Sequence, residues 1–389
     1  MKIQQRASIK ILIIFASIVI YSTASAQTKF VVADDFRSSQ FRGFNISVVE
    51  TYSVLKGKNL SKIRASGANH ARAWIQVTHD AYNRYFFESP TALKTLDSTI
   101  KEAAKVGLYL ILTVEFLPKQ GADDWWGNAA RKSNMIKFWR DSLATRYKSK
   151  TVIAAYDLMN EPRVNSKLYC TVKEYMEFTR DMIIAVRAVD PNHTIVVEVL
   201  ENQMLGDLSI RADSAVFNRT LRYIKNLVYS PHGYSPLAIT HQGLSATTRR
   251  AYPESSGTYM ANYFKNVTYW NEPAKFQNKY NVPIWVGEFA CVNWAPKNSY
   301  GQWTSTRWTQ DVINYMESLG WSWASHAWRE YEGWDIEMPS SWYVTNATFY
   351  YAKPSKLPPS SARTDTAPTF ALFRQYFTRN KKFYLPYYL

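Results

Sequence analysis

The sequence is poor in cysteine, in long apolar runs and in blocks of like charge. Two cysteines in 389 residues are too few for a disulfide framework. Beyond the first 26 residues, no apolar run approaches the roughly 18 residues that a membrane-spanning helix needs. Lys and Arg outnumber Asp and Glu by 47 to 31, but no Lys/Arg block reaches five residues and no nucleic-acid-binding signature is present. These absences exclude a disulfide-stapled scaffold and argue against membrane and nucleic-acid partners for the mature chain.

The sequence is rich in aromatic residues, which make up 15% of the chain, with 14 Trp and 27 Tyr. Hydrophobic residues at 46% and charged residues at 20% exclude an intrinsically disordered chain. At roughly 150 residues per domain the length suggests two or three domains, although an α/β barrel of this size can be one. A basic, aromatic-rich chain suits a nucleic acid, an acidic surface or a sugar polymer, and composition alone does not choose among them.

The N-terminus has the pattern of a secretory signal. Three basic residues flank the start of the apolar run 11–21, and Ala24-Ser25-Ala26 offers a cleavage site. We expect residues 1–26 to be removed and the protein to be secreted (periplasmic, cell-surface or extracellular), with an uncleaved membrane anchor as the alternative. Cleavage would remove three positive charges and no negative one, so the net charge would fall from +16 to +13.

Cys170 and Cys291 could form a disulfide in such a compartment, but their positions in the sequence do not give the distance between them. No cluster of Cys and His lies near either residue. We therefore expect no metal site and no cofactor.

Short runs of β-branched and aromatic residues alternate with longer stretches of helical periodicity. The expected strands are 41–47, 69–75, 108–115, 152–159, 194–200, 227–231, 283–289 and 322–328. The clearest expected helices are 91–106, 132–148, 172–189, 256–280 and 303–319, with a last helix near 369–377. Eight strand–helix units predict an α/β fold of the (β/α)8 TIM-barrel class, as a single domain over residues 27–389. A doubly wound sheet also alternates strands and helices, so the count alone does not separate the two.

Two glutamates stand at the carboxyl ends of apolar strands, where barrel enzymes place their catalytic groups. The run 152–159 leads into Asn160-Glu161-Pro162, and the run 282–287 leads into Glu288. By our count these are the fourth and seventh strands. A second Asn-Glu-Pro occurs at 271–273, but the residues before it have the pattern of a helix, so we assign Glu272 to a surface helix.

With these residues the sequence resembles the cellulase family, glycoside hydrolase family 5, over nearly the whole mature chain. Further matches are Arg72 on the second strand, His232-Gly233-Tyr234 after the sixth and the segment 325–330 at the eighth. A lone Asn-Glu-Pro is a weak signal, but five matches in the right order at expected strand ends are specific. The resemblance implies a (β/α)8 barrel that acts on a polysaccharide or oligosaccharide.

The resemblance also implies that Glu161 is the general acid/base and Glu288 the nucleophile of a retaining glycosidase. In such enzymes the two carboxyl groups stand about 5–5.5 Å apart, on either side of the glycosidic bond. Their surroundings should push their pKa values apart. Arg72 near Glu288 would keep that carboxylate ionised, and Tyr234 could donate a hydrogen bond to it.

The remaining matched residues take substrate-binding roles by the same resemblance. Asn160 would bond the sugar 2-hydroxyl, and His232 would orient the acid or its sugar contacts. Sugar rings present apolar C–H faces that stack on aromatic side chains. Trp328, at the end of the eighth strand, is expected to be the family's platform tryptophan. Trp294, in the rim loop after Glu288, is a second candidate, with ordinary loop packing as the alternative for each.

One position departs from the family pattern. The third strand often ends in a substrate-binding histidine, whereas here Glu115 stands at that position. We take Glu115 as a substrate contact or an ion-pair partner of Arg72 or His70. Strand alternation puts His70 on the same face as Arg72, either in the core or at the rim. Trp125-Trp126, in the loop that follows, are further aromatic candidates.

We therefore expect a secreted, monomeric, retaining β-glycoside hydrolase of the endo-β-1,4-glucanase (cellulase) type. A β-mannanase or another β-glycan hydrolase of the same clan is the alternative. A non-catalytic glycan-binding barrel is opposed by the presence of both glutamates, and a basic nucleic-acid binder would show strongly salt-dependent binding. The net positive charge has three possible explanations: solvated Lys and Arg side chains on the surface, attraction to an anionic cell envelope, or attraction to an anionic polysaccharide.

Overall fold

The structure is a computed structural model that describes residues 29–47, 58–77, 90–116, 127–162, 171–198, 214–253 and 268–380. The expected signal segment, Cys170 and Trp125-Trp126 lie outside these residues. Cys291 lies within them as a buried free thiol. No helix in the described part of the chain has both the length and the apolar character to cross a bilayer.

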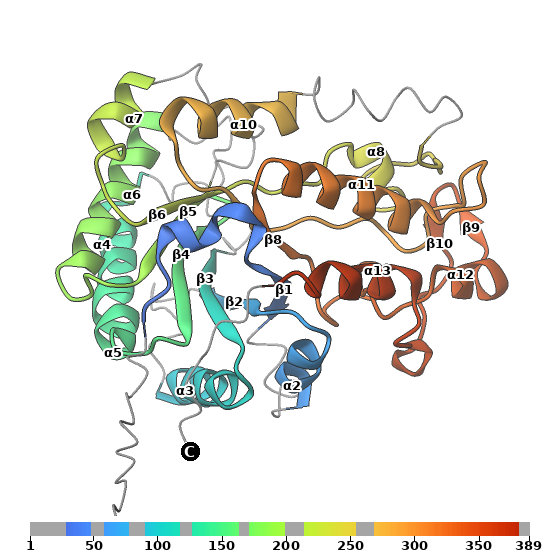
Figure 1. The fold of residues 1–389 in the computed structure, drawn as a ribbon, viewed down its shortest axis with the longest axis horizontal. Helices are drawn as coiled ribbons and strands as arrows, with labels where there is room; N and C mark the ends of the chain where they lie inside the picture. Colours follow the sequence, from blue (N-terminus) through green and yellow to red (C-terminus); the bar gives the residue numbers. More distant parts are fainter. Residues whose placement is uncertain are drawn as a thin grey trace, which may run out of the picture.

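Eight parallel strands form the centre of the molecule, and helices surround them (Figure 1). The strands are β1 (Arg42–Ser47), β2 (His70–Val77), β3 (Tyr109–Phe116), β4 (Ile153–Asn160), β5 (Thr194–Glu198), β6 (Leu227–Ser230), β7 (Trp285–Val286) and β8 (Ser322–Ser325). Their order is β6-β5-β4-β3-β2-β1-β8-β7. Isolated bridges between Tyr229 and Ile284 and between His232 and Glu288 then join β6 to β7. The predicted (β/α)8 barrel is confirmed, and the doubly wound alternative is excluded.

The strands begin and end close to the predicted positions, with β7 as the main difference. Residues 283–289 were expected to form it, but regular pairing is confined to Trp285–Val286. Beyond Val286 the backbone bonds individually to the β6 side, since Gly287 N–H donates to Pro231 O (3.1 Å) and Gly233 N–H donates to Glu288 O (2.7 Å). These single bonds close the barrel where an even ladder was expected.

The helices lie outside the strands and follow the predicted spans where the structure describes them, whereas residues 256–267 of the predicted helix 256–280 lie outside the described residues. The helices are α2 (Lys58–Ala65), α3 (Pro90–Val106), α4 (Ala129–Lys137), α5 (Thr145–Tyr147), α6 (Val172–Arg187), α7 (Ser214–Thr220), α8 (Leu237–Thr240), α10 (Thr268–Tyr280), α11 (Thr304–Ser318), α12 (Ser340–Asn346) and α13 (Pro368–Phe377), with shorter turns η1 (Ala33–Ser39), η3 (Phe138–Ala144) and η4 (Ser360–Ala362). Predicted helix 132–148 runs through α4, the π-helical η3 and α5.

Helix α6 shows how the sequence sets one of these helices. Thr171 and Glu174 form a capping box, in which Glu174 N–H donates to Thr171 Oγ1 (3.2 Å) and Thr171 N–H donates to Glu174 Oε2 (2.7 Å). The buried side chains Tyr175, Met182 and Val186 then recur at helical spacing. The helix packs against α4, η3 and α7, and the Tyr175 hydroxyl donates to Glu198 O of β5 at 2.7 Å.

Side chains inside the barrel change character along its axis. At the amino ends of the strands the interior is apolar, with Ile111, Val196 and Trp285 among its members. His70 belongs to this floor, because its ring meets Phe41 (5.7 Å) and Trp285 (5.8 Å) and burial lowers its pKa to about 3. At the carboxyl ends the interior is polar, and the candidate site lies there.

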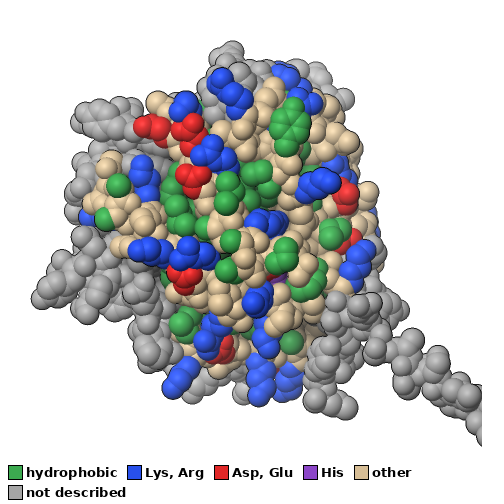
Figure 2. Space-filling view, turned by 90° about the vertical axis from the view of Figure 1, so that its left-hand side faces the viewer, with side chains coloured by type: hydrophobic (Ala, Val, Ile, Leu, Met, Phe, Trp, Pro, Cys, Tyr) green, Lys and Arg blue, Asp and Glu red, His purple; other side chains and the backbone are tan. Residues whose placement is uncertain are grey.

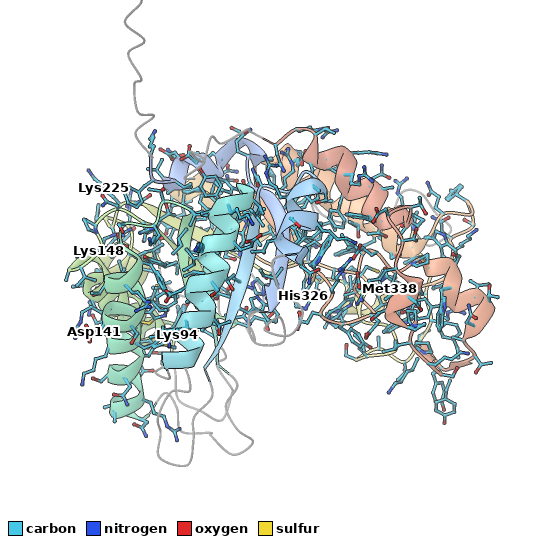
Figure 3. All side chains as sticks on the ribbon, turned by 90° about the horizontal axis from the view of Figure 1, so that it is seen from below. Lys94, Asp141, Lys148, Lys225, His326 and Met338 are labelled. Carbon is cyan, nitrogen blue, oxygen red and sulfur yellow. The ribbon has the colours of Figure 1, made fainter. Side chains whose placement is uncertain are left out.

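The chain makes a long excursion between β8 and α13. Residues 326–367 include α12 and a short hairpin of β9 (Phe349–Tyr350) and β10 (Lys353–Pro354). Figure 3 places His326 at the barrel and Met338 in this excursion to its side. The chain then returns to the barrel wall, where Phe377 stacks on Trp323 at 5.7 Å.

On the face drawn in Figure 2, the basic side chains are dispersed rather than gathered in one patch. Figure 2 shows basic side chains spread over one side of the molecule, with acidic ones among them. Several pair locally, as Arg146 does with Asp97 and Lys173 with Glu177. This distribution fits solvated surface groups rather than a compact anion-binding patch.

Candidate active site

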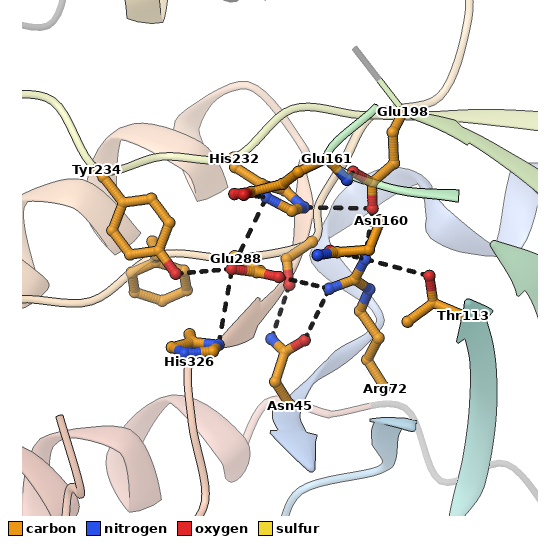
Figure 4. A network of polar contacts seen from close by, with 12 residues as sticks. Asn45, Arg72, Thr113, Asn160, Glu161, Glu198, His232, Tyr234, Glu288 and His326 are labelled. Atoms are coloured by element: carbon orange, nitrogen blue, oxygen red, sulfur yellow. Dashed lines mark hydrogen bonds and ion pairs between the residues drawn. The ribbon is translucent and has the colours of Figure 1, made fainter. Parts of the chain in front are cut away.

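The carboxyl ends of the strands bring together polar side chains that are far apart in the sequence (Figure 4). The predicted residues that converge there are Arg72 from β2, Asn160 and Glu161 from the end of β4, His232 and Tyr234 after β6, and Glu288 after β7. Gly287 makes the convergence possible, because a Cβ on it would come within 2.6 Å of Ser230 Oγ and 3.0 Å of His232 Nε2.

Arg72 is the buried centre of this network. Its Nε donates to Asp157 Oδ2 (2.8 Å), its Nη1 to Glu288 Oε1 (2.7 Å) and its Nη2 to Asn160 Oδ1 (2.7 Å). Nη2 also contacts Glu198 at the end of β5. Burial by itself would lower the pKa of Arg72, but the three carboxylates more than compensate and raise it. One guanidinium thus orders side chains from β4, from β5 and from the segment after β7.

Glu288 lies on the floor of the site with both carboxylate oxygens engaged. Arg72 donates to Oε1, and the Tyr234 hydroxyl donates to Oε2 at 2.7 Å. Burial and the charge of Glu288 raise the pKa of Tyr234, so the phenol keeps its proton and remains a donor. His326 approaches the same carboxylate, with Nδ1 3.6 Å from Oε2. Glu288 is therefore held in one orientation.

Glu161 follows β4 in a conformation that is unusual for a residue with a side chain. Its φ is +40°, in the left-handed region that favours glycine. Its backbone N–H donates to Glu198 Oε2 (2.8 Å), and its Oε1 lies 2.8 Å from His232 Nδ1. Tertiary contacts thus hold both its backbone and its side chain.

Glu161 and Glu288 face each other across a short gap. One carboxylate oxygen of each lies within 4.8 Å of the other, and a nitrogen of His232 lies within the same distance of both. Carboxyl groups about 5–5.5 Å apart suit a nucleophile and an acid/base on one glycosidic bond, whereas about 6.5–9.5 Å leaves room for an attacking water. The distance between the Glu161 and Glu288 carboxylates corresponds to the shorter of these two separations.

Within the described ranges, Glu161, His232 and Glu288 are also the one group whose spacing would suit a metal ion. An imidazole must be neutral to ligate a metal. Burial by itself would lower the pKa of His232, but Glu198 and Glu288 raise it well above its usual range. A protonated His232 opposes metal binding, so proton chemistry suits this cluster better.

A sequence profile supplies the family. The profile described as Cellulase (glycosyl hydrolase family 5) matches residues 27–332, more than three quarters of the chain. The chain belongs to glycosyl hydrolase family 5. Membership of this family identifies the chain as a glycosyl hydrolase, as the sequence motifs predicted.

Curated relatives of this family 5 chain align over part of it. Endoglucanase 3 of Fibrobacter succinogenes is 27% identical over 165 residues, which make up 41% of this chain and 23% of that protein. A β-xylosidase of Phanerodontia chrysosporium is 27% identical over 158 residues, 38% of this chain and 30% of that protein. The chain thus spans less than a third of the length of either relative.

Solved structures resemble this family 5 barrel over most of its length. Cel5A of Thermotoga maritima, in complex with mannotriose, gives a TM-score of 0.65 at 18% identity, covering 88% of this chain and 99% of that one. The cellulose synthase subunit CcsZ of Clostridioides difficile gives a TM-score of 0.59 at 21% identity, covering 76% and 94%. These likenesses show a shared fold.

The two tryptophans expected at the rim lie elsewhere in the family 5 fold. Trp328 is 4% exposed and packs against Phe44 (5.3 Å) and Phe370 (5.8 Å), on the outer side of the barrel. Trp294 is 1% exposed, and its Nε1 donates to Gln242 O at 2.7 Å. Burial of both rings corrects the expectation that they stand exposed to a glycan, and ordinary packing, the alternative, describes them.

Glu115 was expected to reach the substrate or pair with Arg72. Its backbone lies in β3, in register with Asn160 of β4. Its side chain lies outside the described part of the structure, so its role stays a prediction.

Further side chains also belong to the site, among them Asn45, Glu198 and Trp334, which no motif singled out, and His326, which lies in the matched segment 325–330. Asn45 Oδ1 accepts from Arg72 Nη1 (3.0 Å), and Glu198 contacts the same guanidinium. Glu198 could have been found, because it is a glutamate at the carboxyl end of an apolar strand, the pattern that selected Glu161 and Glu288. Asn45 lies two residues before the end of an expected strand, but a neutral amide there carries no chemical signal.

His326 and Trp334 form the wall of the site on the β8 side. His326 stacks on Trp74 at 4.8 Å and meets the ring of Trp334 at 5.1 Å. Trp334 in turn stacks on Tyr234 at 5.9 Å. Trp334 belongs to the excursion after β8, so its approach to Tyr234 follows from tertiary structure and had no local signal.

Proposed function

We propose that this family 5 enzyme is a retaining β-glycoside hydrolase, with Glu288 as nucleophile and Glu161 as general acid/base. The observation that carries the proposal is the gap of at most 4.8 Å between the oxygens of these two glutamates. Their different surroundings support distinct roles. Glu288 is buried between Arg72 and Tyr234, whereas the Glu161 side chain is 23% exposed and contacts His232.

In the first step Glu161 gives its proton to the glycosidic oxygen while a Glu288 oxygen attacks the anomeric carbon. The bond from that carbon to the leaving group breaks, and a covalent glycosyl-enzyme forms on Glu288. Arg72 and Tyr234 orient the attacking carboxylate. Asn160, held by Arg72 Nη2 at 2.7 Å, is placed to bond the sugar 2-hydroxyl as positive charge develops on the ring.

In the second step water attacks the anomeric carbon and its proton passes to Glu161. The bond between that carbon and Glu288 breaks, so the nucleophile returns as a carboxylate and Glu161 returns protonated. The sugar leaves with its original configuration. No other reactant is consumed, and His232 is positioned to orient Glu161 in both steps (2.8 Å).

We propose a β-linked glucan as the substrate, in the endo-β-1,4-glucanase manner. The family and the likeness to an endoglucanase support this choice. A β-mannan or another β-glycan is the second candidate, since the similar Cel5A barrel is described in complexes with both mannotriose and cellobiose. We further propose that residues 1–26 direct secretion and that one domain, residues 27–389, acts as a monomer on its glycan.

The test is reducing-sugar release by the wild type on soluble β-glucan, mannan, xylan and acidic polysaccharides, with Glu288→Ala beside it. We expect release from at least one β-glycan and a loss of at least about 10^4-fold in Glu288→Ala, because the nucleophile is gone. Glu177→Ala, on the outer face of α6, is the control and should keep full activity. Normal hydrolysis by Glu288→Ala, in a variant with wild-type circular dichroism, would overturn the mechanism.

A further inference from the structure

Glu198 is a buried carboxylate that the proposed mechanism leaves without a role. It ends β5 and is 2% exposed. Its Oε2 accepts from the backbone N–H of Glu161 (2.8 Å), and its Oε1 lies 3.3 Å from His232 Nε2 and contacts Arg72. Glu198 thus contacts the backbone of one proposed catalytic residue and the far side of the imidazole that contacts its carboxylate.

The imidazole of His232 lies between two carboxylates, one at each ring nitrogen (Figure 4). Nδ1 is 2.8 Å from Glu161 Oε1, and Nε2 is 3.3 Å from Glu198 Oε1. A carboxylate at one ring nitrogen fixes a proton there, so that the other nitrogen exchanges a proton with the group it faces. The contact at Nε2 has the distance of an ion pair without the geometry of a hydrogen bond, so Glu198 acts on the imidazole through its charge, while Nδ1 is directed at Glu161.

We propose that Glu198 is a positioning residue for the acid/base, and that Glu198, His232 and Glu161 form a chain that holds one proton between His232 Nδ1 and Glu161 Oε1. This proposal rests on the proposed role of Glu161. The shared proton is the one that passes to the glycosidic oxygen in the first step and returns from water in the second. The proton on Nε2 stays beside Glu198 throughout.

The charge state of Glu198 supports this role. Burial by itself would raise its pKa, but His232 and Arg72 lower it, so Glu198 stays ionised. The neighbouring Asp157 carboxyl behaves in the opposite way, because burial and the charge of Glu198 raise its pKa well above the usual range. Of these two buried carboxyls, Glu198 therefore keeps its negative charge more readily than Asp157.

Other charged or titratable groups also surround the Glu161–His232 pair. They are Arg72, Asp157, Tyr234, His241, Glu288, His326 and Glu330. Glu288 is the other anion close to His232, at 3.7 Å, but its charge disappears when the glycosyl-enzyme forms. Glu198 is the anion in contact with the imidazole that no step of the reaction neutralises.

Removing the charge of Glu198 should make the shared proton easier to lose. We expect Glu198→Gln to shift the alkaline limb of the kcat/KM profile to lower pH by about one unit or more, because a nearby anion stabilises the protonated form of the pair. The acid limb should move less. A loss of rate with an unmoved alkaline limb would overturn the proposal.

Substrates with different leaving groups separate this role from simple support of Arg72 and Glu288. With an aryl β-glycoside of poor leaving group, kcat/KM of Glu198→Gln should fall by roughly tenfold or more, because protonation is needed. With a dinitrophenyl β-glycoside, which needs little protonation, it should stay near wild type. Equal losses on both substrates would show that Glu198 acts through the nucleophile, and the proposal would fail.

Asp190→Asn is a matched control at the opposite end of the same strand. Asp190 also pairs with a buried histidine, with Oδ2 2.5 Å from His193 Nδ1, but that pair lies before β5 and away from the site. The control should leave the alkaline limb and the leaving-group dependence unchanged. The same shift in both variants would reveal a general effect of buried charge and overturn the proposal.

A measurement without turnover separates this inference from the proposed function. The chain has six histidines, so the ring nitrogens can be assigned by 15N NMR. In the wild type we expect His232 to stay cationic above the usual histidine pKa of about 6.5. In Glu198→Gln it should titrate at lower pH. A neutral His232 at pH 7 in the wild type would overturn the proposal even if that variant fails to fold, whereas absence of glycan hydrolysis would overturn only the proposed function.

Discussion

The same tripeptide, Asn-Glu-Pro, occurs twice in this chain with opposite outcomes. Asn160-Glu161-Pro162 ends a buried strand and places Glu161 opposite Glu288. Asn271-Glu272-Pro273 lies inside α10, on the outside of the barrel. The proline lies within the helix and removes a backbone donor, yet the buried Trp270 and Phe276 on either side of it anchor α10. Packing therefore decides whether the tripeptide ends a buried strand or lies within an outer helix.

The surroundings of the two glutamates differ as much as their backbones. Glu161 meets an imidazole at 2.8 Å and donates its backbone N–H to a buried carboxylate. Glu272, whose side chain is 14% exposed, forms a local ion pair with Lys275, which is 51% exposed and lies three residues along the helix. A partner from the next turn of a helix is supplied by local sequence, whereas the partners of Glu161 come from β5 and the segment after β6.

The largest expected contrast is in activity. Glu161→Ala should reduce hydrolysis of unactivated glycans by roughly 10^2–10^4-fold, because proton donation to the leaving group is lost. Substrates with good leaving groups should keep much of their rate. Glu272→Ala should stay near wild type in the same initial-rate assay. A large loss in Glu272→Ala would mean that the wrong Asn-Glu-Pro had been assigned.

Substitution of the asparagine in each tripeptide, Asn160 and Asn271, should extend the comparison to stability. Asn160→Ala should lower the free energy of unfolding by about 1.5–3 kcal/mol, because Arg72 Nη2 loses a buried acceptor at 2.7 Å. Asn271→Ala should change it by about 0.5 kcal/mol or less, since Ala is the better helix former. Denaturant midpoints at constant slope would measure both. Equal destabilisation would contradict the assignment of Asn271 to an outer helix face.

The smallest effect is expected at the ion pair between Glu272, in the second Asn-Glu-Pro, and Lys275. Lys275→Ala should lower the free energy of unfolding by about 0.2–0.5 kcal/mol, because a pair three residues apart on a helix surface contributes little. Salt should shrink the difference further. Thermal unfolding at low and high ionic strength would measure this difference. A decrease of several kcal/mol in the free energy of unfolding would show that the pair of Glu272 and Lys275 does more than form a local surface contact.

Much of the fold was predictable because its signals are local. Alternation of β-branched runs with helical periodicity predicted all eight strands, and the resemblance carried by the strand-end residues favoured the barrel over a doubly wound sheet. The weakest strand prediction was 283–289, where regular pairing covers two residues. Its extent depends on bonds such as Gly233 N–H to Glu288 O, which join segments far apart in the sequence. A pattern of side chains carries no information on those bonds.

The site was predictable where a strand end coincides with an unusual residue. Glu161 and Glu288 carry charge at the ends of apolar runs and Arg72 carries charge within one, and the three converge as expected. Trp294 and Trp328 were assigned by position after a strand, and burial in the surrounding packing corrected both. Periodicity tells which side of a strand a residue occupies, but not what covers a loop.

By itself, the sequence determined the barrel class, the order of its strands and the two glutamates at their carboxyl ends, because residue spacing along one element sets which side chains share a face. Tertiary structure alone decided which Asn-Glu-Pro enters the site, and it brought Glu198 to Arg72 across 126 positions. It also placed Trp334, from the excursion after β8, against Tyr234. Contacts of this kind arise from the closure of the barrel, which no local pattern encodes.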